Sequence, residues 1–365
     1  MATTDGRATS KKWRQRLFAL LGVAAFVATV LQADLGGALR LLTELGPVAA
    51  LALLPQGVWT VVYAVGWRDV LWTLGHRVPM RGLAALFFAA EAVMLSLPGG
   101  VMLSESLSVI LLDRKLGVPL VDGLSAAATK KVLIMVSNAL WVLLALALGG
   151  SRIAEASSRW LGSPLLLWAM IAAAVALLVV SAMLALSLAS GSVAQRMSRA
   201  LRRLPSAAVR RWLDERERGH ATADDRLAAP FREPRRLMVA TLWFLAQWAL
   251  ETLETYLLLR LLGAPVTFVD ALAIETMGSL VRSFALMLPA GIGVQDASYV
   301  ALLDAFGVPG ASALGVAFVL LKRAKELAWV GVGYALLGTL RGRPAAAAAP
   351  DNSIDLAERG SLPIA

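Results

Sequence analysis

The feature that most constrains this chain is a series of apolar windows, each close to the length needed to cross a bilayer. A helix needs about 20 apolar residues to span a hydrocarbon core of about 30 Å. Of the 365 residues, 58% are hydrophobic and only 16% are charged, against roughly 25% charged in soluble proteins. We therefore expect an all-α polytopic membrane protein, with six full spans near residues 17–33, 47–66, 124–149, 163–190, 237–261 and 311–340.

Two further apolar windows are interrupted. Residues 82–112 and 271–306 each contain an apolar segment, a Pro-Gly break and a second apolar segment that is short for a full span. Irregular backbone at membrane depth is tolerated only where it is buried in protein or lines a polar cavity. We interpret each window as a broken helical hairpin that enters the bilayer and returns to the same side.

The two breaks belong to an internal repeat. LPGGVMLSESLSVILLDRKLGVP at 97–119 aligns with LPAGIGVQDASYVALLDAFGVP at 288–309, with an offset of 190 or 191 throughout. Each half would contain three full spans and one hairpin, and an odd number of crossings turns the second copy upside down. The sequence therefore predicts an inverted repeat, with a first membrane repeat over 17–149 and a second over 163–340. Such repeats with discontinuous helices are typical of alternating-access transporters.

The distribution of Lys and Arg predicts the orientation in the membrane, because cytoplasmic loops carry an excess of both. Five lie in residues 1–16, three in 67–81 and twelve in 191–236, whereas 262–270 has none. Both termini are therefore expected in the cytoplasm, with the first hairpin open to the cytoplasm and the second to the outside. The N-terminus also has the layout of a signal sequence. Since no A-x-A-like cleavage site follows, we interpret 17–33 as an uncleaved span, with a removed signal as the alternative.

Three segments are expected outside the membrane. Residues 1–16 form a basic cytoplasmic N-terminus. Residues 191–236 hold twelve Arg against six acidic residues, which indicates an Arg-rich cytoplasmic loop with a surface helix over anionic headgroups. The tail 341–365 has too little apolar content to fold and is expected to be disordered.

Basic residues fall near the middle of the two long helices that follow each Gly-Val-Pro. The first carries Lys130 and Lys131, and the second carries Lys322 and Arg323 with Glu326. A charge at the bilayer centre costs at least about 2.5 to 3.5 kcal/mol, so these groups need partners or water. Lys322 and Glu326 are spaced to pair on one helix face.

Acidic residues occupy matching places in the two repeats. Glu105 aligns with Asp296, while Glu91 and Arg282 lie at the same position with opposite charges, so the pseudo-symmetry is expected to bring them together. Cations bind phosphate or carboxylate, and acids bind an amine or a polyol; the same acids are also candidate proton carriers. The alternative for any one charge is a satisfied ion pair or a side chain that snorkels to the interface. The candidate substrate-binding residues are Glu91, Glu105, Lys130, Lys131, Arg282, Pro289, Gly291, Gly293, Gln295, Asp296, Lys322, Arg323 and Glu326.

PAGIGVQDASYVALLDAFGVP followed by LLKRAKELAWVGVGYALL resembles the C-terminal signature of the lysylphosphatidylglycerol synthase transmembrane, or flippase-like, family. SLPGGVMLSESLSVILL resembles the earlier Pro-x-x-Gly-Glu element of that family, and the likeness is closest to its hopanoid-biosynthesis-associated branch. The resemblance covers most of 17–340. It implies a bacterial inner-membrane protein that moves polar lipids between leaflets, with signature positions at Pro289, Gly291, Gly293, Gln295, Asp296 and Arg323.

This chain departs from the family pattern in its first half. Ser104 stands where the family usually has Gly before its Glu, and Lys130-Lys131 stands where Glu-Arg is common. Because only 25 residues of the sequence follow the last predicted span, we expect no aminoacyl-transferase domain of the kind found in the fused synthases. We therefore expect the protein to move lipid or to assist lipid metabolism without making lysyl-phosphatidylglycerol.

The residue composition limits which other functions are open to this chain. The chain has no Cys and two His, so disulfides and thiolate-zinc sites are excluded and we expect no metal or cofactor. We expect membrane lipids as partners, and no nucleic acid. Two alternatives stay open. One is an intramembrane lipid transferase or hydrolase with Glu105 or Asp296 as base, and the other is a non-transporting scaffold for lipid-biosynthesis enzymes that contacts them through residues 191–236.

Overall fold

The computed structural model describes residues 34–97, 99–193, 195, 217–284 and 293–341. Within these ranges the chain is helical and contains no strand, which confirms the all-α fold class. Three of the described helical stretches are long and apolar enough to cross a membrane, namely Leu35–Thr73, Leu120–Leu161 and Leu165–Ala189. The expected span at 17–33, the basic N-terminus and the tail from residue 342 lie outside the described residues.

In the first half of the chain, the described residues form six helices and one 3-10 segment. These are α2 (Leu35–Leu45), η1 (Gly46–Ala52), α3 (Leu53–Thr73), α4 (Met80–Ser96), α5 (Gly100–Leu116), α6 (Leu120–Leu161) and α7 (Leu165–Ala189). The second half contains α10 (Glu217–Ala228), η2 (Ala229–Arg232), α11 (Pro234–Leu261), α12 (Phe268–Phe284), α13 (Val294–Ala305) and α14 (Ala311–Arg341). The helices α11 and α14 cover the predicted windows 237–261 and 311–340, but they are not among the three stretches that are long and apolar enough to cross a membrane.

Each broken window is a pair of helices. The first consists of α4 and α5, and its break requires two glycines for different reasons. Gly99 has a φ of +69°, a left-handed conformation that L side chains rarely adopt. A Cβ on Gly100 would lie 2.3 Å from the Met94 carbonyl oxygen. The second window consists of α12 and α13, and its break at 285–292 lies outside the described residues.

The repeated Gly-Val-Pro ends the second helix of each hairpin. Gly117 and Gly307 have φ of +68° and +73°, which is how glycine commonly terminates a helix. The following valine N–H groups reach back to helix carbonyls, from Val118 to Leu112 at 3.1 Å and from Val308 to Leu303 at 3.0 Å. The motif therefore ends one helix, and the next long helix begins directly after it.

Helix α6 is longer than expected. The predicted span ends at residue 149 and the next one begins at 163, but the helix continues to Leu161 with non-helical dihedrals at Gly149. The extension hides Ile153, Ala156 and Ser157 on one face, and this 3-4 spacing is that of an amphipathic helix. The polar residues that suggested a loop are its outer face.

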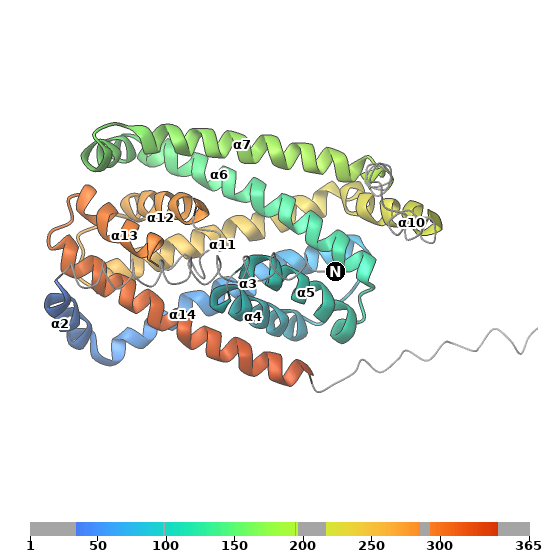
Figure 1. Cartoon of the computed structure of the whole chain (residues 1–365), viewed down its shortest axis with the longest axis horizontal. Helices are drawn as coiled ribbons and strands as arrows, with labels where there is room; N and C mark the ends of the chain where they lie inside the picture. Colours follow the sequence, from blue (N-terminus) through green and yellow to red (C-terminus); the bar gives the residue numbers. More distant parts are fainter. Residues whose placement is uncertain (1–33, 98, 194, 196–216, 285–292, 342–365) are drawn as a thin grey trace, which may run out of the picture.

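The two hairpins lie toward opposite ends of the molecule's long axis, and each contacts the other half of the chain (Figure 1). The helix α14 packs on α4, α12 packs on α6, and α3 packs along α11. Two main hydrophobic clusters follow this division. One gathers around α12, α13 and α14, and the other around α3, α4, α5 and α11.

At each end of the molecule, ion pairs connect segments that are far apart in the sequence. At one end His76 Nε2 lies 2.7 Å from Asp122, and Arg226 of α10 lies 3.4 Å from the same carboxylate. At the other end Arg152 binds Asp270 at 2.7 Å. Segments that the charge distribution assigns to one side of the membrane, 67–81 and the end of 191–236, thus lie together.

Candidate functional site

A cavity of about 550 Å³ lies between the two hairpins and is lined by residues of both, and we call it the charged chamber. Its walls come from α3, α4, α5, α6, α11 and α12, with contributions from α7, α13 and α14. Aromatic side chains line it together with four acidic and three basic residues. The charged lining residues are Glu91, Glu105, Lys130, Lys131, Glu251, Arg282 and Glu326.

In the first half, Glu105 on α5 binds the two lysines of α6. Its carboxylate lies 2.9 Å from Lys130 Nζ and 3.6 Å from Lys131 Nζ. Lys130 is 1% exposed, and its ammonium lies 4.4 Å from the centre of the Trp67 ring and 5.5 Å from that of Phe87. A carboxylate and ring faces together stabilise this buried cation.

In the second half, Asp296 on α13 binds Arg323 on α14. Asp296 Oδ1 accepts from Arg323 Nε at 3.0 Å and Nη2 at 2.8 Å, and Oδ2 accepts from the Gly293 N–H at 2.8 Å. Arg323 Nη1 also donates to Glu326 at 2.6 Å. One carboxylate therefore caps the start of α13 and fixes a guanidinium of the neighbouring helix.

The two clusters have the same construction. In each, an acid on the second hairpin helix binds a base on the long helix that follows. The ammonium of Lys322 also lies over an aromatic ring, 4.6 Å from the centre of Tyr299, as Lys130 lies over Trp67. Glu105 and Asp296 therefore make similar contacts, while their alignment within an inverted repeat stays a prediction.

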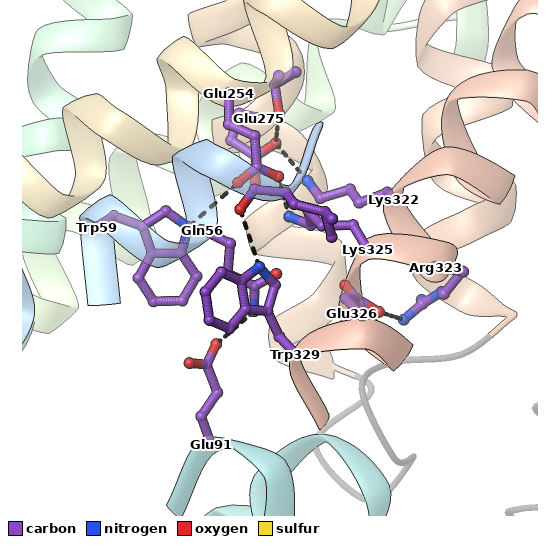
Figure 2. A network of polar contacts seen from close by, with 12 residues as sticks. Gln56, Trp59, Glu91, Glu254, Glu275, Lys322, Arg323, Lys325, Glu326 and Trp329 are labelled. Carbon is purple, nitrogen blue, oxygen red and sulfur yellow. Dashed lines mark hydrogen bonds and ion pairs between the residues drawn. The ribbon is translucent and has the colours of Figure 1, made fainter. Parts of the chain in front are cut away.

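The expected pair between Lys322 and Glu326 is wrong. Lys322 Nζ lies 3.2 Å from Glu275 of α12 and 2.8 Å from the Tyr299 hydroxyl, while Glu326 accepts from Arg323. The reason is that α12 supplies a buried carboxylate on the side to which Lys322 points. Figure 2 shows these contacts around α14.

Glu91 and Arg282 share the chamber without pairing. Glu91 accepts from Gln56 Nε2 at 3.0 Å and from the Thr60 hydroxyl at 3.2 Å, and Arg282 donates to the Ser279 hydroxyl at 3.3 Å. An ion pair between Glu91 and Arg282 does not occur among the described contacts, because neutral donors of α3 satisfy the carboxylate.

Of the four remaining candidate substrate-binding residues, the structure describes two. Gln295 lines the chamber and donates to the Tyr299 hydroxyl at 3.1 Å. Gly293 precedes α13 with a φ of +86°. Pro289 and Gly291 lie outside the described residues.

The list of candidate residues leaves out a buried polar network between α11 and its neighbours, although its acids Glu254 and Glu275 lie within or near apolar windows of the sequence. Glu254 pairs with Lys325 and accepts from the Trp59 indole N–H at 3.3 Å (Figure 2). Thr255 donates to Glu275 at 2.5 Å. A usable signal was present, because Gln247, Glu251, Glu254 and Thr255 recur at helical spacing within an apolar window.

Chemically, the chamber presents hydrogen-bond acceptors and cationic donors next to aromatic faces. Such a lining suits a ligand that carries both a phosphate or carboxylate and a polar or cationic group. Within the described ranges, no group of three or more His, Asp or Glu side chains is placed to hold a metal ion.

No curated protein matches the chain. A family model described as the lysylphosphatidylglycerol synthase TM region matches residues 16–324, a range that contains both hairpins and most of the charged chamber. The chain therefore belongs to the lysylphosphatidylglycerol synthase transmembrane family, a membrane protein family linked to lipid metabolism.

Proposed function

We propose that this protein is a bacterial inner-membrane transporter that moves a lipid with a polar or anionic headgroup between leaflets, without altering it chemically. The observation that carries the proposal is the charged chamber of about 550 Å³ among apolar helices. Its volume falls within the range of roughly 300 to 1,000 Å³ of small-molecule sites. Buried charges inside a membrane protein usually mark a substrate or ion pathway.

The matching construction of the two halves supports transport rather than a purely structural role. Each half contributes a hairpin, an acid on its second helix and a base on the next long helix. An inverted repeat allows one such arrangement to open toward each side in turn. A scaffold needs no charged residues at matching positions inside both halves.

The lining indicates the kind of headgroup. Arg282 and Lys131 offer cationic donors for a phosphate, and Glu91 and Glu251 offer acceptors for an amine or polyol. We therefore propose a zwitterionic or anionic headgroup. Hopanoid lipids belong among the substrates to be tested, because the sequence motifs resemble the hopanoid-associated branch.

The proposed orientation places both termini, the first hairpin's open end and α10 on the cytoplasmic side. The excess of Lys and Arg in 1–16, 67–81 and 191–236 supports it. In this orientation the Arg-rich segment faces anionic lipid and is available to lipid-biosynthesis enzymes.

A leaflet-exposure assay tests the proposal. Purified protein is placed in liposomes with fluorescent phosphatidylglycerol or phosphatidylethanolamine, and a membrane-impermeant quencher reports how much label changes leaflet. We expect protein-dependent exposure that is lost in Glu105→Gln and Asp296→Asn, because each removes the charge that holds the basic residue of its half. The control is Arg232→Gln, which breaks an exposed ion pair with Asp225 and should behave as the wild type.

The outcomes separate the function classes. Absence of exchange for every headgroup, with and without a pH gradient, contradicts the proposal and favours a scaffold. Mass spectrometry of the recovered lipid is part of the assay, because a chemically altered lipid would instead identify an enzyme.

A further inference from the structure

A second cavity of about 300 Å³ adjoins the charged chamber, and we call it the side pocket. It lies between α6, α7 and α12, and Trp248 of α11 also lines it. Apart from Glu275 and a few hydroxyl or amide groups its lining is apolar, and Met170, Ala173, Ala176, Val180 and Leu280 are characteristic members.

The side pocket and the charged chamber share a wall. Six residues line both cavities, namely Met135, Asn138, Leu177, Trp248, Ser279 and Ser283. The change from charged to apolar lining thus occurs across a single layer of side chains. A ligand that occupies both cavities must be polar at one end and apolar at the other.

The shared wall contains an unsatisfied donor. The Trp248 indole nitrogen is buried and lacks a hydrogen-bond partner in the described part of the chain. A buried tryptophan N–H usually finds an acceptor. One turn further along α11, Glu251 lines the chamber and also has a buried oxygen without a partner among the described residues.

The side pocket lies beside the lipid-facing part of the bundle. Figure 1 shows α7 at the edge of the molecule next to α6. The outer face of α7 exposes Val175, Val179 and Met183. A hydrocarbon chain in the side pocket can therefore remain continuous with the bilayer while its headgroup is inside the protein.

We infer that the side pocket holds one hydrocarbon chain of a glycerophospholipid whose headgroup occupies the charged chamber, with the Trp248 indole N–H donating to an ester oxygen at the shared wall. The inference rests on the proposed function for the nature of the headgroup. It adds a chain-binding site, a direction of entry between α7 and α12, and a contact at the ester group. Ester oxygens lie between headgroup and chains in such a lipid, at the depth where Trp248 separates the two cavities.

Photolabelling tests the chain site directly. Full-length protein in liposomes of phosphatidylglycerol and phosphatidylethanolamine receives trace phosphatidylethanolamine with a diazirine in one acyl chain, and labelled peptides are mapped by mass spectrometry. We expect label on the α6, α7 and α12 residues of the side pocket. Ala173→Phe fills the pocket and should abolish that label. The matched control is Ala182→Phe, an exposed alanine on the opposite face of the same helix, which should retain it.

The ester contact has its own variant. Trp248→Phe keeps the ring and removes the N–H, so we expect an about fivefold weaker apparent affinity for the diazirine lipid, the typical value of one hydrogen bond. Unchanged affinity for the diester lipid would overturn the ester contact. A diether analogue should bind wild type and Trp248→Phe with nearly equal affinity.

The outcomes distinguish this inference from the proposed function. Pocket-specific label without leaflet exchange supports the chain site and contradicts transport. Leaflet exchange together with label that is spread evenly over the lipid-facing helices, and is unchanged in Ala173→Phe, overturns the chain site and leaves transport standing. Size-exclusion profiles of each variant establish that the compared proteins are folded.

Discussion

At the scale of single residues, the membrane interior of this protein is organised by ion pairs between helices. Lys325 and Glu254 pair with side chains 4% and 2% exposed, and Lys322 joins Glu275 and Tyr299. Desolvation makes each such charge costly by itself. The pairs therefore stabilise the fold mainly because losing one partner is so unfavourable.

Removing one member of the most buried pair should be more damaging than removing both. We expect Lys325→Met to cost about 3 to 5 kcal/mol, because Glu254 is left buried without its cation. The double variant Glu254→Gln with Lys325→Met should regain most of this loss. Thermal unfolding in detergent measures both effects, and breaking the exposed Arg232–Asp225 pair should change stability by at most about 1 kcal/mol. A double variant as unstable as the single one would contradict this account.

The sequence was sufficient to identify charged residues of the chamber, but it was insufficient to predict their partners on other helices. The chamber lysines, Glu105 and Asp296 were identified from charge placed inside apolar windows. Partners such as Glu275 for Lys322 were not, because a pair between two helices depends on which faces meet. Helical spacing predicts Glu326, on the same helix, as the partner of Lys322. In the structure Lys322 instead binds the buried carboxylate of Glu275 on α12.

At the scale of elements, glycine and proline determine where helices stop. The lengths of the apolar windows and the Pro-Gly breaks were sufficient to predict two pairs of helices, α4 with α5 and α12 with α13. They were insufficient for the end of α6, because an amphipathic helix with a polar outer face has the composition of a loop.

The first hairpin should depend on the missing side chain of Gly100. We expect Gly100→Ala to cost about 1 to 3 kcal/mol, because a Cβ would lie 2.3 Å from the Met94 carbonyl oxygen and the break would have to shift. Gly150→Ala is the control, since a Cβ there meets nothing within 4 Å and helix propensity predicts a gain of about 1 kcal/mol. Equal thermal midpoints for the two variants would show that the break tolerates a side chain.

At the scale of the whole molecule, the two halves depend on close contact between α4 and α14. Phe88 stacks on Trp329 with ring centres 4.8 Å apart. A Cβ on Gly333 would lie 2.2 Å from the Phe88 carbonyl oxygen and 2.6 Å from Ala92 Cβ. The neighbouring residue Glu91 faces the chamber, so this contact sets one of its walls.

Gly333→Leu should therefore separate the halves. We expect a lower thermal midpoint and loss of leaflet exchange, because α14 cannot approach α4 with a large side chain between them. The matched change Gly331→Leu meets nothing within 4 Å of the added Cβ and should preserve both properties. Wild-type exchange in Gly333→Leu would mean that the contact is dispensable for the chamber.

The bend in α6 has a mechanical consequence. At about 1.5 Å per residue its 42 residues measure about 63 Å, more than the thickness of a bilayer with its headgroups, about 40 to 45 Å. The near section carries Lys130, and the far section beyond Gly149 is fastened to the second hairpin through Arg152 and Arg159. Because both sections of α6 are held by contacts, a shift of the second hairpin would move the far section. The helix would pass that movement through Gly149 to Lys130 in the near section.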